Sequence, residues 1–319
     1  MSDSALKDLN IVPLSEGKIT KAGLQKGNDC NAISANNTLP LNDKEALSNG
    51  SEAVSIDVEY IESEKLTEIE DVDSCMMTLM MRLESKDWVT ICEALNNVRQ
   101  ISLFHKEKLL EQLSAVIQLV VKSLKNPRSA VCKTAIMTCS DIFKGYGDIV
   151  VESLDPLLVQ LFLKSSQDKK FVCEAAEAAL ISMTNWVSPS LLLPKLEPYL
   201  KNRNPRVRAK ACMCFSRSVP RLGLEGIKLY GIDKLIRVAA TQLSDQLPES
   251  REAARTLALE LQGFYSQFDD ESLPVQLEPN SESKTNSWEE FCHAKLSRLS
   301  AQAILRVTTT QKESLVASC

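Results

Sequence analysis

Between residues 71 and 268 the apolar residues recur every three or four positions, which is the spacing of one face of an α-helix. Ile91, Leu95, Val98 and Ile101 form one such stripe. Several stretches of this kind follow one another, and short polar turns separate them in pairs. Because each apolar stripe needs a neighbouring helix to cover it, the pattern predicts an all-α fold of stacked helical hairpins.

Five of the turns begin a helix and are polar, and most of them are basic. They are Ser85-Lys86-Asp87-Trp88, Lys125-Asn126-Pro127-Arg128, Gln167-Asp168-Lys169-Lys170, Arg203-Asn204-Pro205-Arg206 and Asp245-Gln246-Leu247-Pro248. Asn and Asp accept hydrogen bonds from the free N–H groups of a first helical turn, so we take Asp87, Asn126, Asp168 and Asn204 as N-caps, with Pro127 and Pro205 at the first helical position. These caps stand 36 to 42 residues apart. A period near 40 is typical of HEAT-type repeats.

The fold class predicted is therefore an α-solenoid of about five HEAT-type helical hairpins, occupying residues 66–268. The expected helix pairs are 71–83 with 88–104, 106–124 with 127–144, 149–164 with 169–186, 190–200 with 205–222, and 228–243 with 248–265. The five polar turns then lie along one edge of the stack.

The segments outside the solenoid differ in composition. Residues 1–65 are acidic, lack a helical period and are rich in Ser, Asn and Asp, so we expect a disordered tail. Residues 269–286 contain two prolines and several serines, which is typical of a linker. Residues 287–319 predict an amphipathic helix and a tail. We expect that helix at 288–306, with an apolar face formed by Trp288, Phe291, Leu299 and Ala303. This face is expected to dock on the fifth hairpin. The alternative is a helix that is tethered by the linker but does not pack on the solenoid.

The sequence offers little for catalysis. It has two histidines and no Gly-rich phosphate loop, HExxH or G-x-S-x-G motif. The ten cysteines form no CxxC pair and fall mostly on apolar helix faces, as in a reducing compartment. We expect no enzyme, no cofactor and no metal. No segment predicts a secretory signal or a membrane span, and a mildly basic body without interleaved aromatics disfavours nucleic acid.

The polar turns remain as the candidate site. Lys or Arg in a first helical turn opposes the positive end of the helix dipole, so its repetition along one edge favours a surface that meets an acidic partner. Trp88 follows the first cap, and its side chain could be buried in the core or exposed at the edge. The equivalent positions in other turns carry no apolar residue of similar bulk, which favours exposure. The candidate binding residues are Lys86, Trp88, Arg128, Lys169, Lys170, Asn204, Arg206, Arg208 and Arg251. An ordinary solvated edge is the simpler alternative.

Taken in order, these turns resemble the five intra-repeat loops of a TOG domain of the CLASP type. The resemblance rests on Ser85-Lys86-Asp87-Trp88, Arg128-Ser129, Lys169-Lys170-Phe171-Val172, Asn204-Pro205-Arg206-Val207-Arg208 and Glu249-Ser250-Arg251, and it spans roughly residues 71–268. In that family the loop edge binds αβ-tubulin. The resemblance implies that Trp88 packs against β-tubulin with help from Arg128 and Lys169. It further implies that Asn204, Arg206, Arg208 and Arg251 contact the far acidic end.

Two departures from the family stand out. We find five helix pairs where the family usually has six, and the fifth turn lacks a clear cap. A single domain of this kind also indicates reliance on self-association or on another localising protein.

The sequence thus predicts a non-catalytic, cytoplasmic, cytoskeletal protein that binds αβ-tubulin or microtubules through the loop edge and regulates their dynamics. The competing interpretation is a general HEAT-repeat scaffold that binds a protein or peptide on its concave helical face.

Overall fold

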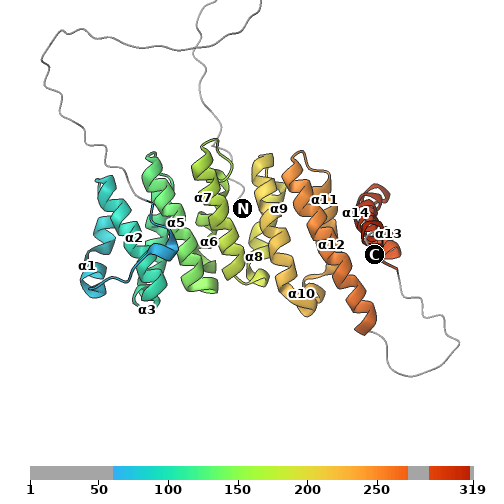
Figure 1. The fold of residues 1–319 in the computed structure, drawn as a ribbon, viewed down its shortest axis with the longest axis horizontal. Coiled ribbons are helices and arrows are strands. Elements are labelled where there is room, and N and C mark those ends of the chain that lie inside the picture. The colour runs from blue at the N-terminus through green and yellow to red at the C-terminus, as the bar shows by residue number, and fades with distance from the viewer. Residues whose placement is uncertain (1–59, 272–286, 317–319) are drawn as a thin grey trace, which may run out of the picture. The chain divides into compact units, whose positions relative to one another are not determined.

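The computed structural model describes residues 60–271 and 287–316, and every regular element in those two ranges is helical. Figure 1 shows these helices side by side in one row, from α1 at one end to α14 at the other. The predicted all-α solenoid is confirmed. Residues 1–59, which make up most of the predicted acidic tail, and most of the predicted linker lie outside the described residues.

The first three hairpins follow the predicted pairs closely. They are α1 (Val72–Leu83) with α2 (Trp88–Phe104), α4 (Leu113–Leu124) with α5 (Ser129–Tyr146), and α6 (Leu154–Lys164) with α7 (Lys170–Trp186). The predicted helices 106–124 and 149–164 are interrupted, because α3 (Lys106–Leu109), η2 (Leu110–Gln112) and η3 (Gly147–Ser153) take up their first turns. Gly147 ends α5 with a positive φ of 51°, which favours glycine and turns the chain into η3.

The next two hairpins are less regular. They consist of α8 (Pro189–Leu196) and η4 (Glu197–Lys201) with α9 (Pro205–Ser218), and of α11 (Ile232–Leu243) with α12 (Pro248–Glu271). Between them lie η5 (Val219–Leu222) and α10 (Gly223–Tyr230). The predicted helix 205–222 therefore ends early, and 228–243 begins late, where Gly231 adopts a φ of 96°. In the other direction α12 runs six residues past its predicted end, into the first residues of the predicted linker.

One apolar core runs through the whole stack. It extends from Leu79 in α1 to Ile304 in α14, and the predicted stripe from Ile91 to Ile101 lies wholly within it. The second helices of successive hairpins pack on one another along one face, as α2, α5, α7, α9 and α12 (Figure 1). Because each hairpin is covered by its neighbours, the positions of the turns along the edge are fixed by the core.

The C-terminal segment completes a sixth hairpin. The single helix predicted at 288–306 is wrong, because the chain breaks at Leu296 into α13 (Trp288–Lys295) and α14 (Arg298–Val316). Extended backbone at Leu296 and the Ser297 hydroxyl, which accepts a hydrogen bond from the Ser300 N–H at 3.3 Å, end one helix and start the next.

The predicted docking on the fifth hairpin is confirmed. The α14 helix packs against α11 and α12, and Tyr265 of α12 contacts the rings of Trp288 and Phe291, at 5.4 and 4.8 Å between centroids. Part of the predicted docking face was wrong, since Leu299 is 80% exposed and Ile304 takes the buried place.

A short segment precedes the first hairpin and lies against the solenoid. We call residues 60–70 the N-terminal strap. It contains the turn η1 (Ser63–Lys65) and the buried Leu66, and its Ser63 hydroxyl donates a hydrogen bond to Asp141 of α5. The predicted tail boundary at residue 65 is therefore wrong, because residues 60–65 are packed on the folded domain.

Candidate protein-binding edge

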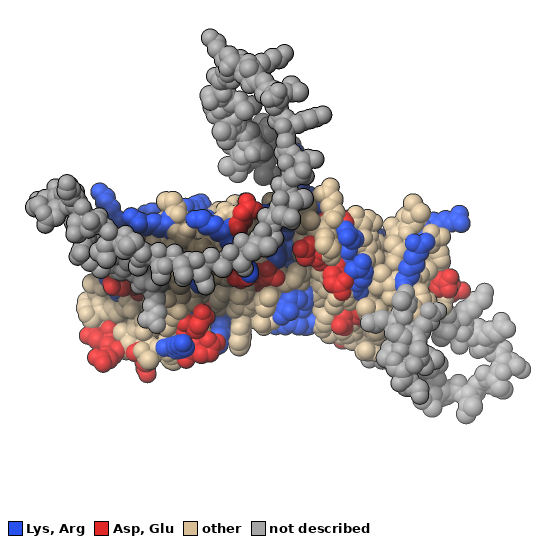
Figure 2. All heavy atoms as spheres, turned by 45° about the horizontal axis from the view of Figure 1, so that its top comes forward, with Lys and Arg blue, Asp and Glu red and all other residues tan. Residues whose placement is uncertain are grey.

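The five polar turns lie along one edge of the solenoid, which we call the loop edge. Each turn joins the first helix of a hairpin to the second, so all five lie at the same end of the stack, the upper end in Figure 1. Figure 2 brings this edge forward and shows Lys and Arg side chains along it.

Two of the four predicted N-caps are present. The Asp87 carboxylate accepts hydrogen bonds from the hydroxyl and N–H of Thr90, which lower the pKa of the Asp87 carboxyl. Asn204 accepts from the N–H of Arg206 at 2.9 Å, with Pro205 at the first helical position as predicted.

The caps predicted at Asn126 and Asp168 are wrong. The helices α5 and α7 begin later than expected, so Arg128 and Lys169 occupy their N-cap positions, without a side-chain cap, and Pro127 lies outside the helix. Asn126 instead closes the turn by accepting from the N–H of Arg128. One oxygen of the Asp168 carboxylate instead pairs with Arg206 of the next turn.

Trp88 is half-buried, so its side chain is neither fully in the core nor fully exposed at the edge. It packs against the solenoid core, and the exposed guanidinium of Arg128 lies 5.3 Å from the centre of its ring. That distance is within the range of a cation–π interaction. The first two turns therefore present one composite surface, an aromatic ring with a cation on it.

The next turns are tied together by contacts between residues about forty apart. Lys169 Nζ donates to Ser129 Oγ at 3.0 Å, and Arg206 binds the Asp168 carboxylate at 2.8 Å and the Ser166 carbonyl at 3.2 Å. Each basic side chain thus reaches back to the preceding turn. Since both partners of the Arg206–Asp168 pair are well exposed, at 55% and 94%, that pair contributes little to stability.

The far end of the edge is built differently. Arg208 is mostly buried and its Nε lies 2.6 Å from the Asp245 carboxylate, of which only 5% is exposed. Burial opposes ionisation of Asp245, but hydrogen bonds from Arg208 and from the backbone prevail, so the pKa of the carboxyl is lowered. Arg251 donates to the carbonyls of Asp245 and Gln246. Both arginines hold the fifth turn in shape.

Apart from Trp88, the predicted site residues thus fall into two groups. Those that present an exposed basic group on the edge are Lys86, Arg128, Lys169, Lys170 and Arg206, and Asn204 is exposed beside them. Arg208 and Arg251 are turned inward. Two further exposed cations, Lys125 and Arg203, belong to the same surface and were missed as site residues. Their place in the predicted polar turns, next to Asn126 and Asn204, was the signal that could have found them.

The described residues offer no second kind of site. They contain no group of three His, Cys, Asp or Glu side chains that could hold a metal. Within the same described ranges, no helix is long and apolar enough to cross a membrane. The buried cysteines are poor nucleophiles, since burial raises the pKa of Cys212 to about 12.

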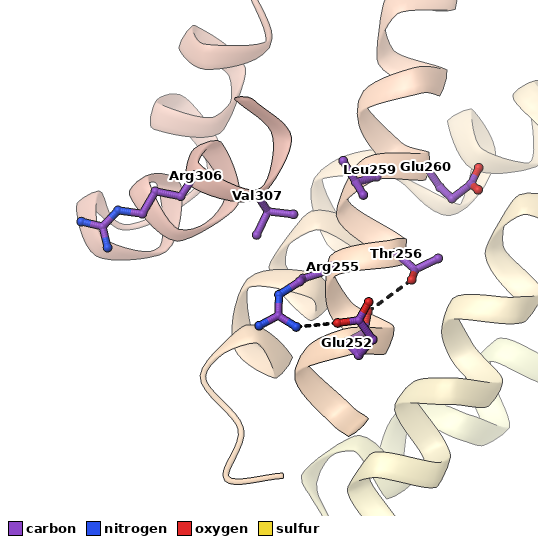
Figure 3. A pocket seen from close by; sticks show the side chains of 7 residues that line it. All are labelled: Glu252, Arg255, Thr256, Leu259, Glu260, Arg306 and Val307. Carbon is purple, nitrogen blue, oxygen red and sulfur yellow. Dashed lines mark hydrogen bonds and ion pairs between the residues drawn. The ribbon is translucent and has the colours of Figure 1, made fainter. Parts of the chain in front are cut away.

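A groove of about 690 Å³ lies between α12 and α14. Figure 3 shows Arg255 paired with Glu252 on one wall and Arg306 pointing away from α12, so charges do not converge on it.

Stacked hairpins with a polar edge define a TOG-type solenoid, and the solved structures agree. The TOG domain of C. elegans Zyg9 matches with a TM-score of 0.52 at 15% identity, covering 74% of this chain and 82% of that one. The MAST/Orbit N-terminal domain matches with a TM-score of 0.50 at 12% identity, covering 73% and 96%. At these identities the likeness shows the fold alone.

The chain belongs to the CLASP N-terminal family, whose model matches residues 76–285, more than half of the sequence. Mus musculus TOG array regulator of axonemal microtubules protein 1 is 28% identical over 138 residues, or 43% of this chain and 8% of the relative. Caenorhabditis briggsae Protein CLASP-2 is 21% identical over 187 residues, or 57% and 24%. The chain therefore spans less than a quarter of the length of these relatives. The family is non-catalytic and microtubule-associated, which confirms that the chain is not an enzyme.

Proposed function

We propose that this protein binds αβ-tubulin through the loop edge and so associates with microtubules in the cytoplasm. The observation that carries the proposal is the first two turns, where the half-buried Trp88 and the exposed Arg128 form one surface. An aromatic side chain anchored in the core and projecting at an edge loses little conformational freedom on binding, which is typical of an interface hot spot.

The charge of the edge supports the same partner. Exposed cations continue from Lys86 through Arg128 to Lys169, Lys170 and Arg206, so the edge fits an acidic protein surface. By the family resemblance, that surface is the acidic face of the tubulin dimer. One TOG-type domain meets one dimer, and self-association or another localising protein would raise the apparent affinity for microtubules, whose dynamics the binding regulates.

The test is a binding titration of the full-length protein with soluble tubulin at two salt concentrations. We expect the affinity of the wild type to fall as salt rises, because exposed basic groups meet an acidic surface. Trp88→Ala should weaken binding about thirtyfold.

The matched control is Trp186→Ala, which removes a 49% exposed tryptophan at the end of α7, on the opposite edge. A folded protein without salt-sensitive tubulin binding, or equal losses for the two tryptophan variants, would exclude the loop edge.

A further inference from the structure

The N-terminal strap has the contacts of a bound peptide. Three of its side chains lie at intervals of three residues; two of them meet a distinct partner on the helical face, and the third is buried. The ring of Tyr60 lies 3.9 Å from Lys133 Nζ, the Ser63 hydroxyl donates to Asp141 at 2.7 Å, and Leu66 is buried. This face belongs to the second helices of the hairpins, so it is separate from the loop edge.

Beneath the strap lies a fully buried arginine. The Nε of Arg99 lies 2.6 Å from the Asp141 carboxylate, and both side chains are almost wholly inaccessible. Its two terminal nitrogens donate to Asn96 at 3.0 Å and to the Ser63 hydroxyl at 3.3 Å. A buried guanidinium is stable only when its donors are satisfied, so the strap completes an ion pair that joins α2 to α5.

The backbone of the strap is recognised as well. Gln100 of α2 donates from its side-chain amide to the carbonyl of Thr67 at 2.8 Å. The strap carries four glutamates and one lysine, so the segment that this face accepts is acidic and largely extended.

The surface continues beyond the strap. A groove of about 410 Å³ opens between Glu62–Glu64 of the strap and the helices α5 and α7. Its lining includes the apolar side chains of Met137, Ala175 and Ala178, and Phe171, which also lines it, is 42% exposed. Lys133 lies between the rings of Tyr60 and Phe171, with its Nζ 6.0 Å from the centre of the Phe171 ring. The face therefore extends further than the strap covers.

We propose that the face of α2 and α5 is a binding groove for an extended acidic segment with tyrosine, serine and leucine at intervals of three, and that residues 60–70 occupy it in cis. Covalent attachment gives the strap an effective concentration in the millimolar range, so it excludes free segments of the same chemistry. The helical face is closed by the chain itself.

The test uses the full-length protein with a weakened strap, Tyr60→Ala, Ser63→Ala and Leu66→Ala together. A fluorescent peptide of residues 60–70 is titrated against this variant and against the wild type. The variant should bind the peptide at least about tenfold more tightly than the wild type, because its own strap no longer competes. A control variant, Lys65→Ala with Thr67→Ala and Glu70→Ala, alters three exposed strap residues and should behave as the wild type.

Two results would overturn the proposal. One is a folded, helical weakened-strap variant that binds the peptide no better than the wild type does, or that binds equally well a peptide carrying the same three alanines. The other is fast hydrogen exchange throughout residues 61–70 of the wild type, which needs no variant and so stands even if the triple substitution unfolds the protein.

Discussion

The two ends of the loop edge contain the same kinds of residue and use them in opposite ways. At the first end Arg128 lies exposed on the ring of Trp88, whereas at the other end Arg208 is buried against Asp245 and Arg251 binds backbone carbonyls. The two ends differ because Arg208 has a buried carboxylate partner, whereas Arg128 has an aromatic one. A buried carboxylate makes Arg208 part of the fold, whereas Arg128, which lies on the half-buried ring of Trp88, stays exposed and available to a binding partner.

The largest expected effect is on stability at the far end. Arg208→Ala leaves the Asp245 carboxylate buried without its partner, which should lower the free energy of unfolding by about 3 kcal/mol. Arg128→Ala, at the exposed end, should lower it by less than about 1 kcal/mol. Urea denaturation of the two variants measures the difference, and equal losses would break the comparison.

Acid should act on the same far-end pair. The folded-state pKa of Asp245 is lowered, so its stabilisation is fully present above the pKa of an unfolded aspartate, about 3.9, and is lost as the pH falls through the folded-state value. We expect Asp245→Asn to flatten the fall in stability below about pH 4. Asp73→Asn, at an exposed pair with Lys108, is the control and should leave the fall unchanged.

The next effect is on binding at the first end. Trp88→Ala should weaken tubulin binding by about 2 kcal/mol. Because Trp88 is half-buried against the core, the same change should also lower stability by about 1 to 2 kcal/mol, less than the loss expected for a fully buried tryptophan. Titration and thermal unfolding of one preparation separate the two losses. A large stability loss with unchanged affinity would assign Trp88 to the core alone.

A smaller effect is expected at the fourth turn. Arg206→Glu should weaken tubulin binding by about 1 kcal/mol and reduce its salt dependence. It should add to the effect of Trp88→Ala, since the two side chains lie three hairpins apart and share no partner. The control is Lys144→Glu, which reverses an exposed charge near the end of α5, away from the loop edge. Equal effects of the two reversals would indicate a response to net charge rather than to the edge.

The smallest effect is expected from Asp168→Asn. This change releases Arg206 from an exposed pair, so stability should shift by less than about 0.5 kcal/mol. Tubulin affinity should rise by about twofold, because one negative charge leaves a basic surface. A loss of affinity in the same titration would show that Asp168 positions Arg206 for the partner.

The sequence predicted the hairpins well because their apolar stripes and most of their turns are local features. It did not show the role of Arg208, because its partner Asp245 lies 37 residues away. The sixth hairpin was seen as one helix, since Leu296 continues the apolar pattern through the break. Residues 60–65 of the strap were taken for tail, because the glutamates around Tyr60 and Ser63 hide two side chains whose partners lie on distant helices.

The contacts between successive turns fix the spacing of the basic residues along the loop edge. Lys169 contacts Ser129 and Arg206 contacts Asp168, each in the preceding turn. Successive basic turns therefore lie one hairpin apart, at the spacing of packed helices, about 10 Å. A substitution in one turn changes how strongly that turn binds the partner, but the distances between turns are set by the packing of the core. A partner must therefore match the edge in length as well as in charge, and lengthening one turn would not bring a mismatched surface into register.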